Sequence, residues 1–505
     1  MPLLNTIASW WMRKRMHQIE LFMKYPHDVQ EEWFKILISS GKDTEWGRKF
    51  DYSSIDNYRQ FNQRVPIQDY ETLKPFIERA RMGEQNILWP GEIKWFAKSS
   101  GTTSDKSKFI PVSEEALEEC HYNGGRDMLA IHCTNHPDTK LFTGKNLGLT
   151  GSYKVDHLNE YDSYSGDLSA IVVQNLPLWA EFFCSTDLSI ALMSEWEEKL
   201  EKIARATMQE NITSLAGVPS WLLVLLKRIL DLSGKKIIGE VWPNLEVFFH
   251  GGVNFLPYKE QFKTIFHSDK VCYTELYNAS EGFFGIQDQA ESDDLLLMLD
   301  YGIYYEFIKM DQSGENNQAI PLSEVELNKN YAIVITTNAG LWRYKLGDTI
   351  KFTSLQPFRF RITGRTKHFI NAFGEELIID NADNGLKIAC EKMGSLIKEY
   401  TAAPYYMSNL ATGAHEWLIE FEKDPEDIGY FAEVFDNALK SLNSDYEAKR
   451  YNNLILKLPL IHIARKNLFY DWMKSRDKLG AQNKVPRLSN NRVYLDELLK
   501  LNNAG

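Results

Sequence analysis

Cysteine is scarce in this 505-residue sequence, and none of the cysteines is paired with another along the chain. Cys120, Cys133, Cys184, Cys272 and Cys390 are odd in number, lie far apart and form no Cys-x-x-Cys motif. This pattern excludes a disulfide framework and gives no zinc motif. We therefore expect a protein of a reducing compartment, the cytoplasm.

Positive charge is also in deficit, because 57 lysines and arginines stand against 69 acidic residues and leave a formal net charge of −12. A nucleic-acid-binding protein normally presents a basic face to the phosphates, so this balance argues against one. The sequence has no internal repeat and no low-complexity tract, and no feature of it indicates an obligate protein partner. With 44% hydrophobic and 25% charged residues, it has the composition of an ordinary globular protein.

The sequence lacks an apolar run long enough to span a membrane, and the nearest candidate is the N-terminal segment 1–26. Basic residues at 13–15 and Glu20 interrupt this segment, so it fits neither a spanning helix nor a signal peptide. The favoured interpretation is an amphipathic helix packed on its own domain. The alternative is a helix lying on a membrane surface, with Trp10 and Trp11 as anchors.

The length of the chain predicts two domains, because single hydrophobic cores stop growing somewhere below about 300 residues. Up to about Leu232 the periodicity is mostly helical. Residues 245–252 then predict a buried strand, residues 256–266 a helix, and residues 270–285 a second strand that runs into a polar loop. Strand, helix and strand in this order are typical of a parallel sheet, whose ligands lie at the carboxyl ends of the strands.

After Asp294 the sequence consists of strand-like runs separated by turn residues, which predicts antiparallel meanders or a small barrel. Beyond residue 364 helical and strand patterns alternate again, in a stretch long enough for a separate domain. We therefore predict an α/β fold in two parts. Residues 1–364 would form a large domain with parallel sheets flanked by helices and an antiparallel, barrel-like part. Residues 365–505 would form a smaller, mobile α+β domain.

The stretch KSSGTTSDKSKFIPVS, residues 98–113, is rich in hydroxyl groups with lysines around them. A glycine flanked by serine and threonine lets successive backbone N–H groups point inward, which makes a concave nest for phosphate oxygens. Lys106 and Lys108 would supply positive charge, although the spacing is not that of a Walker loop. A strand-like run containing Trp95 leads in, and Ser113 is placed to cap a following helix. Taken alone, such a run is more often a solvated turn.

Two polar segments follow the strands of the predicted parallel unit. In HGGVN, residues 250–254, a glycine pair would let a flat ligand approach the backbone, and an ordinary strand-to-helix turn is the simpler alternative. In ELYNASEG, Tyr277 offers a ring face for a base, Ser280 a donor and Glu281 an oxygen ligand for Mg²⁺. Neither segment is conclusive by itself.

Two later segments also contain candidate binding residues. In WRYKLGDTIKF, Asp348 follows a glycine between strand-like runs, where a carboxylate is usually a turn residue but can also grip both hydroxyls of a ribose. In FRFRITGRTKHF, Arg365 and Lys367 lie just past the predicted domain boundary, where they could reach a bound anion when the domains close. The alternative for the second segment is a solvated linker.

The joint order of these segments resembles that of the adenylate-forming superfamily of acyl-CoA synthetases, luciferases and peptide-synthetase adenylation domains. Three of them are closer to one branch: SSGTT followed by KFIP, Tyr-x-x-Ser-Glu at 277–281, and RYKLGD at 343–348. They resemble the nucleotide motifs of the Gretchen Hagen three family, the auxin-responsive acyl acid amido synthetases of plants with bacterial relatives. The resemblance extends from the N-terminal helix to NKVPRLSNNR near the C-terminus, so it covers essentially the whole chain.

The resemblance implies a nucleotide-binding role for each matching residue. The phosphate loop would be formed by Ser99, Ser100, Gly101, Thr102 and Thr103. The adenine pocket would be formed by Gly251, Gly252 and Tyr277, with Ser280 beside them, and the ribose clamp by Asp348. Arg365 follows the glycine of the superfamily's hinge motif, and Lys367 falls on the hinge position.

The same resemblance implies three catalytic residues. Lys484 matches the late lysine that the superfamily brings onto the adenylation centre, and Glu281 matches the Mg²⁺ carboxylate. Arg126 falls where plant relatives place an arginine that faces the acyl carboxylate. Asp105 and Ser107 depart from the family's usual Gly-x-Pro-Lys continuation of the loop, and the Asp105 carboxylate would repel triphosphate unless it points away.

The implied activity is that of a ligase that uses ATP and Mg²⁺ to activate a small carboxylic acid as an acyl-adenylate and then transfers the acyl group to an amino acid. One alternative keeps the adenylation but has CoA as the acceptor. Another is a catalytically silent nucleotide binder that has kept the fold. No residue identifies the acid, the amine or the general base of the second step.

Overall fold

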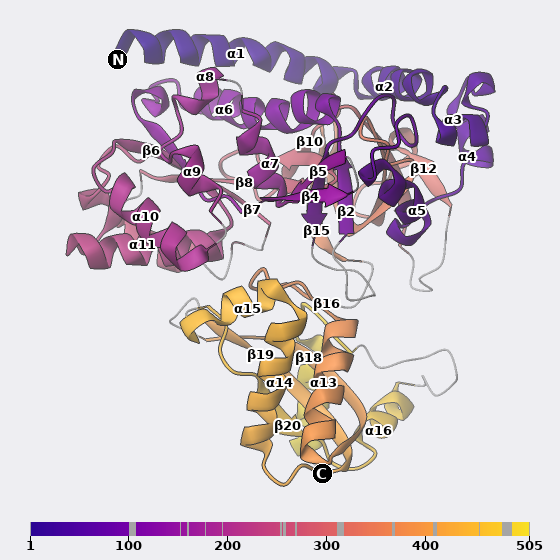
Figure 1. The fold of residues 1–505 in the computed structure, drawn as a ribbon, viewed down its shortest axis with the longest axis vertical. Helices are drawn as coiled ribbons and strands as arrows, with labels where there is room; N and C mark the ends of the chain where they lie inside the picture. Colours follow the sequence, from indigo (N-terminus) through magenta and orange to yellow (C-terminus); the bar gives the residue numbers. More distant parts are fainter. Residues whose placement is uncertain are drawn as a thin grey trace. The chain divides into compact units, whose positions relative to one another are not determined.

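The computed structural model describes residues 2–99, 108–151, 153–158, 161–176, 178–193, 195–252, 255, 259–267, 270–310, 318–365, 369–407, 412–453, 455–476 and 487–503. They fall into two compact units (Figure 1), the first built mainly from residues up to 365 and the second mainly from residues after 368. The predicted fold class, an α/β fold with a smaller α+β part at the C-terminal end, is confirmed.

The central sheet of unit 1 has eleven strands in the order β12-β11-β13-β14-β15-β10-β9-β8-β7-β6-β3. Its parallel end comprises β3 (Lys145–Gly148), β6 (Ile212–Gly217), β7 (Val247–Gly251) and β8 (Cys272–Ala279). Its antiparallel end comprises β9 (Gly282–Ile286), β10 (Leu295–Leu297), β11 (Ile303–Lys309), β12 (Ala319–Pro321), β13 (Asn330–Thr337), β14 (Tyr344–Leu355) and β15 (Phe358–Arg365). The parallel unit predicted from the sequence is confirmed as β7, α12 (Lys259–Phe266) and β8.

A second sheet in unit 1 was largely missed by the sequence analysis. Its order is β2-β1-β5-β4, built from β1 (Trp95–Ser99), β2 (Lys108–Val112), β4 (Tyr153–Leu158) and β5 (Tyr161–Gly166). Only the run leading into β1 was predicted. The sequences of β4 and β5, YKVDHL and YDSYSG, contain too few apolar residues to show the alternation that marks a half-buried strand.

Helices cover both sides of the parallel end of the central sheet (Figure 1). On one side Val247 and Phe249 of the sheet pack against Met12 and Ala130, which lie on α1 and α6. Figure 1 shows α10 and α11 on the other side. The helices of unit 1 that precede α12 are α1 (Pro2–Lys24), α2 (Pro26–Gly41), α3 (Glu45–Lys49), α4 (Tyr58–Arg64), α5 (Tyr70–Arg81), α6 (Asn123–Asn135), α7 (Leu168–Gln174), α8 (Leu178–Glu181), α9 (Leu188–Ala191), α10 (Trp196–Thr207) and α11 (Pro219–Ser233).

The N-terminal helix α1 packs on its own domain, as the favoured interpretation predicted. Met12, Ile19 and Phe22 are buried, and Arg15 forms buried ion pairs with Asp127 and Asp300. Among the described residues, no helix combines the length and the apolar content that crossing a membrane requires.

Unit 2 is a small α+β assembly with its own core. Strands β18 (Leu396–Tyr406), β19 (Gly413–Lys423) and β20 (Leu460–Ile463) form its main sheet, and β16 (Phe369–Ile370) pairs with β17 (Leu377–Ile378). Its helices are α13 (Ile379–Met393), α14 (Ile428–Leu442), α15 (Ser444–Arg450), α16 (Leu468–Ser475) and α17 (Val493–Asn503). Leu418 of the sheet packs with Phe469 and Trp472.

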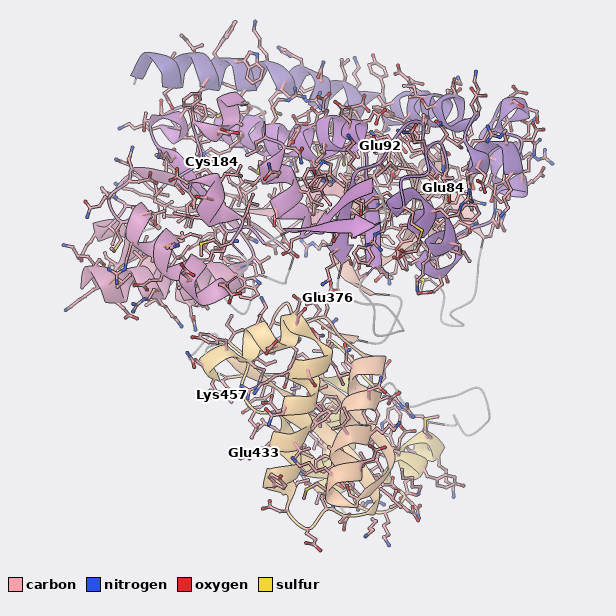
Figure 2. All side chains as sticks on the ribbon, in the orientation of Figure 1. Glu84, Glu92, Cys184, Glu376, Glu433 and Lys457 are labelled. Carbon is pink, nitrogen blue, oxygen red and sulfur yellow. The ribbon has the colours of Figure 1, made fainter. Side chains whose placement is uncertain are left out.

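The cysteines of the described structure form no disulfide. Figure 2 labels Cys184 of unit 1, which is a free thiol like the other cysteines.

Candidate active site

The two ends of the predicted phosphate loop are described, at the end of β1 and at the start of β2. Ser99, the last residue of β1, stands opposite Lys108, the first residue of β2. Ser100, Gly101, Thr102 and Thr103 lie outside the described residues. After β2 the Ser113 hydroxyl accepts a hydrogen bond from the Ala116 backbone N–H at 3.0 Å, which confirms the predicted cap. A π-helical segment, η2 (Ala116–Tyr122), follows and leads directly into α6.

The glycine pair at the end of β7 lies next to β8, and both of its backbone positions require glycine. Gly251 pairs with Leu276 in the parallel ladder, and a Cβ on Gly251 would lie 2.4 Å from the Leu276 carbonyl oxygen. Gly252 has a φ of +81°, which side chains rarely allow. The backbone of β8 therefore lies against Gly251 and leaves no room for a side chain beside Leu276, the residue that precedes Tyr277.

Ser280 and Glu281 form the turn of the β8–β9 hairpin. Strand β8 ends at Ala279 and β9 begins at Gly282, with Ala279 paired to Gly282. The turn lies at the carboxyl end of β8, the edge where parallel sheets bind their ligands. The sequence predicted this position for Glu281, although it did not predict that β9 would return as a paired strand.

Tyr277 and Asp348 are 71 residues apart and meet in the structure. The Tyr277 hydroxyl donates to Asp348 Oδ2 at 2.5 Å, and both residues are buried. Their strands, β8 and β14, are four steps apart in the sheet, which would separate them by about 19 Å if the sheet were flat. The antiparallel end must therefore curl strongly, as the prediction of a barrel-like part required. The Tyr277 ring packs against Phe284 and Phe360.

The remaining predicted nucleotide residues are only partly described. Arg365 is the last residue of β15, and its backbone stands opposite Asp348 in the antiparallel ladder. Lys367 and Lys484 lie outside the described residues. The structure thus groups Gly251, Gly252 and the Ser280–Glu281 turn around the end of β8, and it joins Tyr277 of that strand to Asp348.

Arg126 lies on α6, which packs against the strand that follows the Glu281 turn. A Cβ on Gly124 would lie 2.3 Å from the Phe283 ring, so the start of α6 is pressed onto β9. The Arg126 side chain is 31% exposed, and its Nη2 donates to Asn123 Oδ1 at 2.8 Å. Its Nε has no hydrogen-bond partner within the described part of the chain.

The carboxylate next to Arg126 is already neutralised by a different arginine. Asp127 accepts hydrogen bonds from Arg15 at 2.8 and 2.9 Å and from the Tyr301 hydroxyl at 2.8 Å. Burial raises the pKa of Asp127, while Arg15 acts in the opposite direction. Because Asp127 is occupied and Arg126 Nε lies 3.8 Å from it, the Arg126 guanidinium keeps the capacity to bind another carboxylate.

The first half of the RYKLGD motif has a structural role that the sequence analysis missed. Arg343 is fully buried and donates to both carboxylate oxygens of Glu306, at 2.9 Å from Nε and 2.7 Å from Nη2. It also donates to the carbonyl oxygens of Asn62 and Val65. A single acid inside the apolar strand run GIYYEFIKM was the signal that could have identified Glu306 as the partner of a buried base.

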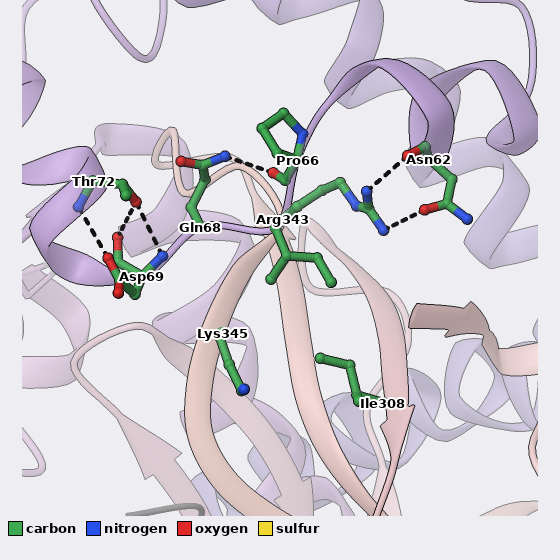
Figure 3. A pocket seen from close by; sticks show the side chains of 9 residues that line it. Asn62, Pro66, Gln68, Asp69, Thr72, Ile308, Arg343 and Lys345 are labelled. Carbon is green, nitrogen blue, oxygen red and sulfur yellow. Dashed lines mark hydrogen bonds between the residues drawn. The ribbon is translucent and has the colours of Figure 1, made fainter. Parts of the chain in front are cut away.

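A cavity of about 490 Å³ lies above Arg343 (Figure 3). Ile308 in its lining belongs to a small apolar cluster with Ala332 and Val334 that is separate from the main core. None of the candidate nucleotide residues lines this cavity. It is lined by Asn62, Pro66, Ile67, Gln68, Asp69, Thr72, Ile308, Arg343 and Lys345.

Among the residues that the structure describes, no three His, Cys, Asp or Glu side chains are grouped closely enough to form a metal site. A Mg²⁺ ion that accompanies a nucleotide does not need such a group. It is usually bound by one or two carboxylates and by the substrate's own phosphates, which is the arrangement that Glu281 alone would support.

Comparison with known proteins assigns the chain to a family. The GH3 family N-terminal domain matches residues 15–271, the central domain residues 296–365 and the C-terminal domain residues 380–493. The indole-3-acetic acid-amido synthetase GH3.4 of Arabidopsis thaliana is 24% identical over 97% of this chain and 93% of its own length. The 4-substituted benzoates-glutamate ligase GH3.12 of the same plant is 23% identical over 91% of this chain and 92% of its own.

Solved structures support the same fold. The GH3.15 acyl acid amido synthetase superposes with a TM-score of 0.63 at 17% identity, over 98% of this chain and 96% of that one. A 2-hydroxyisobutyryl-CoA ligase superposes with a TM-score of 0.55 at 14% identity, over 95% of this chain and 92% of that one. The resemblance seen in the sequence is confirmed by the three matched domains, and the chain belongs to the GH3 family.

Proposed function

We propose that this chain is an ATP-dependent acyl acid amido synthetase, which activates a small carboxylic acid as an acyl-adenylate and transfers the acyl group to the amine of an amino acid. The observation that carries the proposal is the meeting of Tyr277 and Asp348 beside the Glu281 turn, within a GH3 chain. The full-length relatives named as amido synthetases and as a benzoates-glutamate ligase support the choice of an amino acid as acceptor.

The residues at the end of β8 fit an ATP substrate. Gly251 and Gly252, at the end of the strand that pairs with β8, would contact the flat adenine through their backbone next to Tyr277. Asp348, which already accepts a hydrogen bond from Tyr277, would bind the ribose hydroxyls. Ser99, Ser100, Gly101, Thr102 and Thr103 would hold the phosphates through their hydroxyl and backbone N–H groups.

Arg126 would bind the carboxylate of the acid substrate. Arg15 donates directly to Asp127, whereas Arg126 lies 3.8 Å from that carboxylate through its buried Nε, so the terminal N–H groups of Arg126 would pair with a substrate oxygen. A guanidinium binds a carboxylate through two parallel hydrogen bonds, which orients the attacking oxygen as well as holding it. Its helix packs on β9, directly after the Glu281 turn.

The chemistry follows from the poor reactivity of a carboxylate towards amines. One carboxylate oxygen attacks the α-phosphorus of ATP and forms a new P–O bond, and pyrophosphate leaves with the electrons of the broken bond. The amine then attacks the acyl carbon, and AMP leaves. Glu281 would hold Mg²⁺, whose charge stabilises the phosphoryl oxygens.

We also propose the two-domain arrangement that the sequence predicted, with a separate role for each domain. Residues 1–364 would carry the adenylation site, and residues 365–505 would form a mobile lid that turns about Lys367 and supplies Lys484 to the phosphoryl oxygens. The free cysteines accord with a cytoplasmic enzyme.

The test is a pyrophosphate-release screen of a carboxylic-acid panel, run with amino acids, with CoA and with neither, followed by mass spectrometry of the products. The proposal predicts acid-dependent release and an amide with at least one amino acid. A thioester alone would contradict it and favour a CoA ligase. Glu281→Ala should abolish release, whereas the exposed carboxylate variant Glu291→Ala should leave it unchanged. No release with any acid would favour a silent nucleotide binder.

A further inference from the structure

The outward face of α1 has no part in the proposed active site, yet it is strongly apolar. Five large side chains on this face are about half exposed: Ile7 (53%), Trp10 (55%), Trp11 (48%), Leu21 (55%) and Tyr25 (45%). Figure 1 shows α1 along the outer edge of unit 1, so the face is accessible over its length. Apolar side chains gathered in this way usually mark an interaction surface.

The exposed side chains follow the spacing of a coiled-coil seam. Ile7, Trp11, Lys14, Gln18 and Leu21 of α1 are separated alternately by four and three residues, so they form one stripe along the helix, and Tyr25 continues the spacing just after the helix ends. The helix is 23 residues long, which corresponds to about 35 Å. Trp10 flanks the stripe, and the Lys14 ammonium lies 3.6 Å from the centre of its ring.

The stripe is complementary to its own reversed copy. When two copies of the helix run antiparallel and are aligned at residue 16, Ile7 lies opposite Tyr25, Trp11 opposite Leu21, and Lys14 opposite Gln18. Apolar residues then meet apolar residues, and the two polar positions meet at the centre. In a parallel arrangement Lys14 would face the Lys14 of the other copy, which is repulsive.

We propose that α1 pairs with the α1 of a second copy of this chain, in the antiparallel direction. A polar pair inside a seam fixes register and direction at a cost in affinity. The contact would be isologous, so it closes as a dimer and does not extend into a fibre.

The size of the stripe predicts a weak, reversible dimer. Five half-exposed apolar side chains from each copy would bury on the order of 1,000 Å² in total, which is below the range of stable specific interfaces and within that of weak, transient ones. The net charge of −12 on each chain also opposes association at low salt.

The first test is sedimentation equilibrium of the full chain over a range of concentrations. Wild type should show a monomer–dimer equilibrium, and Trp11→Glu or Leu21→Glu should each raise the dissociation constant at least tenfold. Phe182→Glu is the matched control, because Phe182 is 81% exposed but lies off α1, and it should change nothing. Acid-dependent pyrophosphate release should be retained by all three variants.

The second test measures direction. In an Ile7→Cys/Tyr25→Cys double variant, mild oxidation should give disulfides that join position 7 of one copy to position 25 of the other, identified by mass spectrometry. Links from 7 to 7 would overturn the antiparallel pairing. A chain that stays monomeric at every concentration would overturn the dimer, and binding of the monomer to phosphatidylglycerol vesicles would assign the stripe to a membrane surface instead.

Discussion

The two ends of the RYKLGD motif lie five residues apart and hold buried polar pairs of different kinds. At Arg343 the guanidinium uses Nε, Nη1 and Nη2 in hydrogen bonds to Glu306, Asn62 and Val65. At Asp348 the carboxylate accepts a hydrogen bond from Tyr277, on a strand four steps away in the sheet. The first pair joins packed elements, and the second joins the two strands that carry residues of the candidate site.

Hydrogen bonding around the two ends differs in the same way. Nε, Nη1 and Nη2 of Arg343 all donate to protein groups, although the side chain also lines the cavity of Figure 3. Beside Asp348, a Cβ on Gly347 would meet nothing within 4 Å. A buried cation whose donors are all taken by the protein serves the fold, whereas open space beside the chain is what a ligand requires.

The largest effect on stability is expected at the Arg343 end. Arg343→Met leaves Glu306 buried without its cation, which should lower the free energy of unfolding by about 3–5 kcal/mol. The measurement is urea unfolding followed by circular dichroism. The double variant Arg343→Met/Glu306→Leu should recover part of that loss, because both charges are then gone. An unchanged midpoint in the single variant would show that this pair does not hold the fold.

At the Asp348 end the expected effect is on catalysis. Asp348→Asn should reduce acid-dependent pyrophosphate release by about 10²–10³-fold, because a charged contact to substrate is lost from a buried site. Its urea midpoint should stay close to that of wild type, since the asparagine amide oxygen can still accept from Tyr277. If Asp348→Asn had a much lower urea midpoint but released pyrophosphate at the wild-type rate, Asp348 would serve the fold and not catalysis, which would contradict the difference proposed between the two ends.

Tyr277→Phe should give a smaller effect than Asp348→Asn. It removes the hydroxyl that orients Asp348 and keeps the ring, so the loss in pyrophosphate release should be about tenfold. In the double variant with Asp348→Asn the two losses should not add, because one acts through the other. Additive losses would mean that Tyr277 acts on the nucleotide independently of Asp348.

The smallest effect concerns a buried group at the other, amino-terminal edge of the parallel strands. His132 is buried, and burial together with the neighbouring His136 lowers its pKa to about 4 from an ordinary value near 6.5. Between these values the unfolded chain binds the proton and the folded chain does not, so stability falls as the pH falls from 6.5 towards 4.

His132→Gln should remove that contribution, which amounts to about 1 kcal/mol between pH 7 and pH 5.5. The measurement is urea unfolding of both proteins at the two pH values, with pyrophosphate release unchanged at pH 7. An identical pH dependence in both proteins would show that His132 is not the group responsible.

Parts of this fold were predictable because they depend on local pattern. The β7–α12–β8 unit was predicted from a buried strand, a glycine pair and a helical period in direct succession. The candidate site was predicted from motif resemblance, and only Glu281 lies where strand order alone would place a ligand group, in the turn after β8.

The features that were missed depend on long-range contacts or on polar strands. The partner of Arg343 lies 37 residues away in sequence, and the Arg15–Asp127 pair spans 112 residues. A periodic pattern in the sequence does not indicate which of the many Asp and Glu residues will pair with a buried arginine such as Arg343. The β4–β5 hairpin was missed because its strands are polar, so the pairing is decided by the sheet they join.

The central claim is that Tyr277, Glu281 and Asp348 surround one nucleotide. Isothermal titration calorimetry of ATP with Mg²⁺ tests it most directly, on wild type and on Asp348→Asn under the same conditions. The account predicts one ATP bound per wild-type chain, with affinity at least tenfold weaker in the variant. Equal affinities in the two proteins, or no heat of binding in wild type, would contradict it.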